Sequence, residues 1–197
     1  NNVAVGSNAL AANTIGADNT SVGDSSMIAN TTGSHNTALG GQALDANTTA
    51  DYNTAVGRLA LTNNTTGSNN TAIGSQALEA NTSADNNTAV GFQALEAVNG
   101  AGHSNTSIGY QAGATTTTGD ANVFIGFQAG KDKHAADNNT LWVARASADP
   151  GNAGMWIYGQ SNGSCIQGNN ATAWTQYSDE RIKKNIVDSP NGLAKID

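Results

Sequence analysis

The sequence contains few of the residues on which most functional sites depend. Its 197 residues include one cysteine, Cys165, two prolines and 5% aromatic residues. A single cysteine excludes a disulfide framework and a metal site built from cysteines. No run of about 18 apolar residues occurs, so we expect no transmembrane helix.

Charged residues are also scarce. They make up 12% of the chain, about half of the usual share. The formal net charge of −7 makes nucleic acids and anionic membranes poor partners. Residues 1–130 contain eight acids and one base, Arg58, whereas residues 178–197 contain four of each. We therefore expect the tail to be a separate unit.

The N-terminus shows no signal-peptide pattern. Asn1 to Ala4 include neither the basic nor the apolar block of such a peptide. The chain also begins within its repeating pattern, so we expect it to be a piece of a longer protein.

Glycine recurs with a regular period, which indicates a repeat protein. Successive members of this glycine column are 17 residues apart, with one spacing of 18. The extra residue falls within 98–102, which we interpret as a loosened turn. The column consists of Gly6, Gly23, Gly40, Gly57, Gly74, Gly91, Gly109 and Gly126.

Three further columns accompany the glycines. An aliphatic residue directly precedes each glycine: Val5, Val22, Leu39, Val56, Ile73, Val90, Ile108 and Ile125. An asparagine lies four positions before it, as in Asn36, Asn53, Asn70 and Asn87. Four positions after it stand Leu10, Met27, Leu44, Leu61, Leu78 and Leu95, and then Gly113 and Gly130. A decayed ninth copy covers 139–143, with Val143 in the glycine position.

Each repeat is predicted to be one coil of an all-β solenoid. Seventeen residues do not close a whole number of helical turns, and Asn, Thr and Gly are weak helix formers. The Asn-Thr-Ala-Val-Gly segment alternates polar and apolar residues and suits a strand. A second short strand is expected at Gln-Ala-Leu, with turns between the two strands. The asparagines can form a ladder of amides, and the glycine marks a positive φ or a close approach.

A single chain is not expected to be stable alone. Each coil offers about two aliphatic anchors, worth roughly 1.5–3 kcal/mol apiece. Ordering seventeen residues costs on the order of 25 kcal/mol. Burial between chains would reduce this deficit, with the aliphatic and leucine columns on an inner face. We therefore expect an oligomer.

The repeated Asn-Thr-Ala-Val-Gly…Gln-Ala-Leu pattern resembles the YadA-like head repeat of trimeric adhesins and many phage tail fibres. The resemblance covers residues 1–143. It implies a left-handed parallel β-roll in which three chains pack side by side. At about 4.8 Å per coil, nine coils would form a rod of roughly 43 Å.

Residues 144–177 differ in composition, and we interpret them as a connector that caps the rod. All three tryptophans, Trp142, Trp156 and Trp174, lie from the last coil onward. A strand is expected at 155–159, after a turn at 150–151. An apolar plug at the end of the solenoid is favoured over a glycan-binding platform, because no set of polar ligands accompanies the aromatic residues.

The tail, Ser-Asp-Glu-Arg-Ile-Lys-Lys-Asn-Ile at 178–186, resembles the start of the intramolecular chaperone domain of endosialidase-type phage tailspikes. In that family the domain assists trimerisation and then cleaves itself off at the serine. The resemblance implies Ser178 as the nucleophile and Lys183 as its base, with cleavage after Tyr177. A lysine with a lowered pKa can act in this way. A charged helix start capped by Ser178 is the structural alternative, and both can hold together. The chain ends at Asp197, well short of a complete chaperone domain, so it is either truncated or unprocessed.

Other candidate sites are weak. His35, His103 and His134 occupy different positions in the repeat, so exposed turn residues are favoured over a metal or anion site. The Asn-X-Thr sequons, such as the one at Asn30, arise from the repeat and need not be glycosylated. Asp18, Asp51 and Asp85 lie in turns, but the spacing of calcium-binding repeats is absent. No cofactor is expected.

The leading hypothesis is a homotrimeric phage tail-fibre or tailspike segment in the virion, which attaches to a glycan or protein receptor on the host surface. The head of a bacterial surface adhesin is one alternative. The shaft of a polysaccharide depolymerase is another. Enzymatic activity on an external substrate has no support within 1–197.

Overall fold

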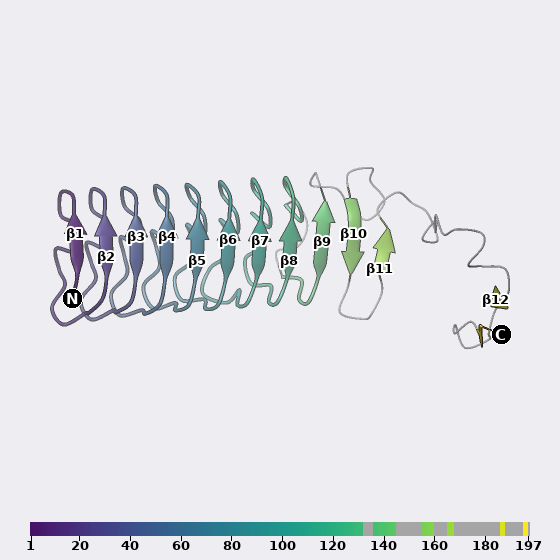
Figure 1. Cartoon of the computed structure of the whole chain (residues 1–197), viewed down its shortest axis with the longest axis horizontal. Coiled ribbons are helices and arrows are strands. Elements are labelled where there is room, and N and C mark those ends of the chain that lie inside the picture. The colour runs from purple at the N-terminus through teal and green to yellow at the C-terminus, as the bar shows by residue number, and fades with distance from the viewer. Residues whose placement is uncertain (132–135, 145–154, 160–164, 168–185, 188–194, 197) are drawn as a thin grey trace.

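The computed structural model describes residues 1–131, 136–144, 155–159, 165–167, 186–187 and 195–196. Eleven strands form one sheet in chain order, and two short strands form a second sheet. Figure 1 shows the coils of the first sheet side by side along the length of the molecule. The fold is therefore an all-β parallel solenoid with coils of 17 residues. Within the described residues, no helix has the length and apolar character needed to span a membrane.

Each coil contributes one short strand to the parallel part of the sheet. The three-residue strands pair in register, so that Thr54 lies opposite Thr71 and Val56 opposite Ile73. Equivalent positions therefore stack directly on one another. The strands are β1 (Val3–Val5), β2 (Thr20–Val22), β3 (Thr37–Leu39), β4 (Thr54–Val56), β5 (Thr71–Ile73), β6 (Thr88–Val90), β7 (Thr106–Ile108), β8 (Val123–Ile125) and β9 (Leu141–Ala144).

The prediction of a second strand in each coil is wrong. The Gln-Ala-Leu segment is a turn, in which Gln42 and Leu44 have φ values of 59° and 52°. It still bonds to the neighbouring coils, since Gln42 N–H donates to Asp24 O and Leu44 N–H to Ala60 O. Sequence reasoning missed this conformation because glutamine and leucine rarely adopt positive φ.

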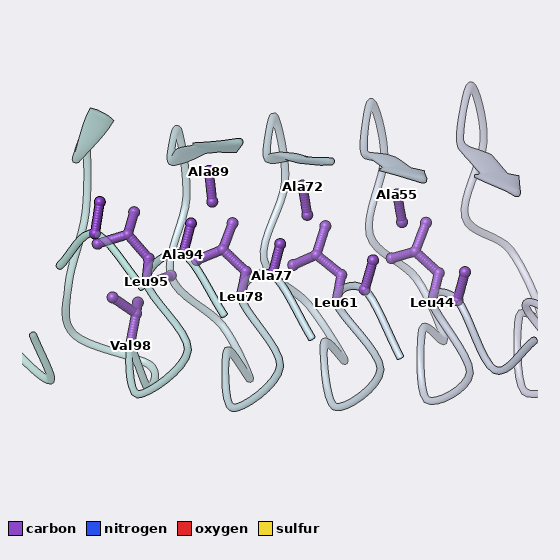
Figure 2. Packing of buried hydrophobic residues seen from close by; sticks show 14 of the residues in the cluster. Leu44, Ala55, Leu61, Ala72, Ala77, Leu78, Ala89, Ala94, Leu95 and Val98 are labelled. Carbon is purple, nitrogen blue, oxygen red and sulfur yellow. The ribbon is translucent and has the colours of Figure 1, made fainter. Parts of the chain in front are cut away.

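The leucine column, defined as Leu10, Met27, Leu44, Leu61, Leu78 and Leu95, lies inside each coil. Leu44, Leu61, Leu78 and Leu95 have no exposed surface. Figure 2 shows them in a row, with the strand alanines Ala55, Ala72 and Ala89 facing them. The expectation that this column lies between chains is therefore wrong, since the chain's own strand covers it.

The core changes in the last coils. Phe124 replaces the strand alanine in β8 and is fully buried. A Cβ at Gly113 would lie 2.7 Å from Phe124 Cδ2, and a Cβ at Gly130 would lie 2.3 Å from Phe124 Cδ1. Glycine replaces leucine at these two positions because the phenylalanine ring occupies the space.

The extra residue between β6 and β7 is absorbed in a turn, as predicted. Thr88 of β6 still pairs with Thr106 of β7. Val98 takes the buried place that asparagine has in earlier coils, and Asn99 N–H donates to Thr117 O. The insertion therefore leaves the strand register intact.

The ninth copy lies one residue out of the expected register. Val143 pairs with Ile125 and so belongs to the aliphatic position, not to the glycine position. Thr140 replaces the asparagine, because its N–H donates to Asn122 Oδ1. The apparent match of Asn139 to the asparagine column misled the sequence reading.

Beyond β9 the sheet continues with antiparallel instead of parallel strands. Strand β10 (Met155–Gly159) lies antiparallel between β9 and β11 (Cys165–Gln167). The strand predicted at 155–159 is confirmed. In the second sheet, β12 (Ile186–Val187) pairs antiparallel with β13 (Lys195–Ile196). The expectations of a cap over 144–177 and a tail unit from 178 stay predictions.

Candidate interaction surface

The strands present an apolar outer face, which is the candidate functional surface of the rod. In a strand, successive side chains point to opposite faces. Here the small residue, such as Ala72, points inward with no exposed surface, whereas Ile73 points outward and is 41% exposed. We call the column Val5, Val22, Leu39, Val56, Ile73, Val90, Ile108 and Ile125 the aliphatic column. It lies on the surface of the single chain, partly or largely exposed in every coil.

This outer face carries no charge. The strands β1 to β8 contain no acidic or basic residue. The second outward position of most strands is a half-buried threonine, as in Thr54 and Thr71. Most acids lie in turns: Asp18, Asp51, Asp85 and Asp120 in the turn before the strand, and Asp45, Glu79 and Glu96 after the leucine column. Asp24, like Arg58, directly follows a column glycine.

Three stacked aromatic side chains border this face in coils six to eight. Phe92, Tyr110 and Phe127 each follow the column glycine. Their ring centroids are 5.4 and 5.2 Å apart, with interplanar angles of 15° and 9°. The side chains remain 39%, 44% and 51% exposed. We call these three residues the aromatic ridge.

A ladder of glutamine amides runs beside the aromatic ridge. Gln111 Nε2 donates to Gln93 Oε1 at 2.6 Å, and Gln128 Nε2 donates to Gln111 Oε1 at 2.8 Å. Lys131 Nζ also donates to Gln111 Oε1. These polar groups therefore have partners within the chain.

Two carboxyl groups have altered acidity, and one of them, Glu96, accepts a hydrogen bond from Gln93 of this ladder. Burial raises the pKa of Glu96, and the nearby Glu79 raises it further, whereas the hydrogen bond from Gln93 and the charge of Lys131 oppose the change. Burial also raises the pKa of Asp45. Both groups lie at the end of the Gln-Ala-Leu turn, away from the aliphatic column.

The turn before the strand uses its polar side chains to join successive coils. Ser34 N–H donates to Asp51 Oδ1, and Ser68 N–H donates to Asp85 Oδ1. Asp85 N–H donates to His103 Nδ1, and His103 N–H to Asp120 Oδ1. These carboxylates cap backbone groups of the preceding coil. In the part of the chain that the structure describes, no group of three or more His, Cys, Asp or Glu side chains could hold a metal ion.

His35 and His103 lie in different columns, as expected, and His134 lies outside the described residues. His35 stacks on Tyr52 with a centroid distance of 4.9 Å. Tyr52 is 59% exposed and belongs to the turn before the strand, not to the outer face. Tyr52 is therefore a suitable control for exposed aromatic residues on the outer surface.

Both predicted roles of the glycine column are confirmed. The column glycines have φ values between 116° and 142°, a region that other residues avoid. A Cβ at Gly74 would also lie 2.4 Å from Gly91 O of the next coil. The column therefore needs glycine for its φ and for its close approach. The same φ range holds for Gly6, Gly23, Gly40, Gly57, Gly91, Gly109 and Gly126.

The predicted asparagine column joins coils through the backbone. Asn53 Oδ1 accepts from Asn70 N–H, and Asn70 Nδ2 donates to Ala84 O. Asn36, Asn53, Asn70 and Asn87 are fully buried. One pair of amides in this column bonds directly, since Asn105 Nδ2 donates to Asn87 Oδ1. A continuous amide-to-amide ladder is formed in the second turn, by Asn13, Asn30, Asn47, Asn64 and Asn81. Because these include the sequon asparagine Asn30, the fold hides that sequon.

The predicted catalytic pair, Ser178 and Lys183, lies outside the described residues. The same holds for Tyr177 and Trp174. The self-cleavage hypothesis therefore stays a prediction.

Sequence reasoning missed the aromatic ridge, although the repeat contains a signal for it. The residue after the glycine is Ser7, Asp24, Gly41, Arg58 and Ser75 in the first five coils, and aromatic in the next three. Aligning the repeats column by column reveals this change. Comparisons with protein-family models, with curated proteins and with solved structures each found no match to this chain.

Proposed function

We propose that the chain is part of a homotrimeric phage tail fibre or tailspike, in which three left-handed rolls pack side by side through their outer faces. The rod attaches the virion to a glycan or protein receptor on the host surface. A self-cleaving chaperone that begins at Ser178 assists its assembly.

The exposed aliphatic column is the observation that carries this proposal. A strand that faces water on one side usually buries its large apolar residues and exposes its polar ones. These strands do the opposite, with Ala72 inside and Ile73 outside. An apolar stripe of this length on a protein surface marks a contact with another surface.

The charge distribution favours copies of the same chain as the partner. In a parallel assembly each column faces the equivalent column of its neighbour, so a column of acids would repel itself. The outer face has no charged residue in β1 to β8. Most of the acids lie in the turns, so association through the uncharged face keeps the charges of a chain with net charge −7 out of the contact.

The viral assignment rests on the two sequence resemblances. The head repeat fits both tail fibres and bacterial adhesins. The tail at 178–186 favours the fibre, because an adhesin head leads into a coiled-coil stalk.

The variant Ile73→Asp tests the proposed assembly. Aspartate on the exposed face of a single chain costs little, whereas unpaired carboxylates buried at one level between chains cost several kcal/mol each. Light scattering at micromolar concentration is expected to give three times the chain mass of 19.9 kDa for the native protein and the chain mass for the variant.

Two controls separate assembly from folding. Ile15→Asp makes the same change at a turn residue that is 78% exposed, and it should leave the mass unchanged. Leu78→Asp places the charge in the core of the coil and should abolish folding. A native protein that is a folded monomer, or an Ile73→Asp variant with unchanged mass and melting temperature, contradicts the proposal.

A further inference from the structure

We infer that the aromatic ridge of Phe92, Tyr110 and Phe127 is the main contact between copies of this chain. The copies would then be held together most firmly over coils six to eight. This inference rests on the proposed function, because it names which part of the outer surface binds the neighbouring copy.

The ridge widens the exposed apolar surface in coils six to eight. In coils one to five only the aliphatic column is apolar, because the position after the glycine is small, polar or charged. In coils six to eight an aromatic residue occupies that position. Ile108 and Tyr110 are separated only by Gly109, which has no side chain, and each is 44% exposed. From this spacing we place the two columns next to one another, as one wider apolar surface.

The orientation of the rings indicates the kind of partner. The rings stack on one another at 5.2–5.4 Å, so the stack itself occupies most of the ring faces. Because the rings are nearly parallel and half exposed, mainly their edges are left for a partner to contact. A sugar binds to the face of an aromatic ring, whereas ring edges pack against apolar side chains or against the faces of other rings. The ridge is thus suited to an apolar protein surface.

The surroundings of the ridge permit complete burial. The glutamine ladder beside it already pairs its amides within the chain, as in Gln111 with Gln93. These bonds are already formed within the chain, so burial of the ladder would not break them. The charged residues at the ridge position, Asp24 and Arg58, lie two or more coils away in the N-terminal part.

A second copy in parallel register fits these features. It brings an identical apolar patch to the same level. Glu96 and Lys131, which lie beside the patch at the glutamine ladder, are opposite in charge. Aromatic residues at the centre of such patches contribute a large share of binding energy. The ridge is therefore expected to dominate the affinity between chains.

Hydroxyl-radical footprinting of the unmodified protein tests this inference. Tyr110 and Tyr52 are similarly exposed in the single chain, at 44% and 59%. In the assembled protein we expect Tyr52 to be oxidised freely and Tyr110 about tenfold more slowly, because residues at the centre of an interface are shielded from water. Equal oxidation of the two residues in a protein of trimer mass overturns the inference and leaves the trimer standing. A monomeric protein overturns both.

The triple variant Phe92→Ser, Tyr110→Ser, Phe127→Ser provides the second test. Serine occurs naturally at this position in Ser7 and Ser75, so the coil accommodates it. We expect the concentration of half-dissociation to rise at least about 100-fold. Tyr52→Ser, which removes an exposed stacked ring elsewhere, should change it less than about twofold. Unchanged dissociation overturns the inference, and unchanged dissociation with lost binding to bacterial cells assigns the ridge to the receptor.

Discussion

At the scale of single residues, the repeat selects for backbone conformations as much as for side chains. The column glycine must have positive φ and must also lie against the backbone of the next coil, so no other residue fits. The leucine position has positive φ too, near 50°. The strain at leucine is offset because its side chain fills the centre of the coil. Where Phe124 fills that space, glycine takes the position.

The variant Gly74→Ala should strongly destabilise the rod. Its Cβ would lie 2.4 Å from Gly91 O, and φ is 134°. Strain of this kind costs on the order of 1–3 kcal/mol for the dihedral alone. Gly41→Ala is the matched control, since the nearest atom to its Cβ is 3.9 Å away. Thermal unfolding followed by circular dichroism should show a large loss for Gly74→Ala and almost none for Gly41→Ala. Equal losses would contradict the contact across coils.

The variant Glu96→Gln should stabilise the fold at neutral pH. The pKa of Glu96 is raised above its ordinary value of 4.5, so the folded state favours the protonated carboxyl. Native stability therefore falls as the pH rises above about 4.5, when this group ionises. Glutamine stays neutral and can still accept from Gln93. Melting temperatures should be higher for the variant at pH 7 and should converge at pH 4. If the difference in melting temperature is the same at both pH values, ionisation of Glu96 is not its cause.

At the scale of the coil, the sequence predicts the period, the strand and the glycine positions, because in-register stacking repeats the same environment every 17 residues. It does not predict which side of the strand faces the core. The alternation in Thr-Ala-Ile is equally consistent with either side, and the usual preference for large apolar residues inside is wrong here. It also misses the turn at Gln42 to Leu44, since propensity argues against positive φ at those residue types.

The exchange of leucine for phenylalanine in the core can be tested by a double-mutant cycle. Phe124→Ala should cost about 3–5 kcal/mol through the cavity it leaves. Gly130→Leu should also destabilise, because its Cβ would lie 2.3 Å from Phe124 Cδ1. Combining the two recreates the alanine and leucine pair of coils three to six. Denaturant unfolding should show that the double variant recovers at least half of the summed loss. Additive losses would show that the two positions do not share one space.

At the scale of the whole molecule, one rod has two apolar regions with different roles. The leucine column closes each coil within the chain, whereas the aliphatic column and the aromatic ridge remain exposed on its surface. Folding of a coil and association of chains therefore depend on different side chains. Variants such as Leu78→Asp and Ile73→Asp should accordingly fail at different steps. The sequence could not assign these roles, because both columns are aliphatic and have the same period.

The tail offers a test of assembly in the complete gene product. Its resemblance to self-cleaving chaperones predicts cleavage between Tyr177 and Ser178. Attack of the Ser178 hydroxyl on the Tyr177 carbonyl requires a base, and Lys183 must be neutral to act as one. A partly desolvated site that forms only in the folded trimer would provide that condition.

Cleavage would then release the chaperone only from correctly assembled rods and leave them kinetically trapped. Ser178→Ala should give one uncut chain by mass spectrometry, because alanine has no hydroxyl to attack. Lys183→Ala should slow or abolish the cut. The assembly variant Ile73→Asp should remain uncut as well, since it prevents the trimer while leaving Ser178 and Lys183 in place. If Ser178→Ala is cut at the same bond, an external protease is responsible. If Ile73→Asp is cut as fast as the native chain, processing does not depend on assembly through the outer face.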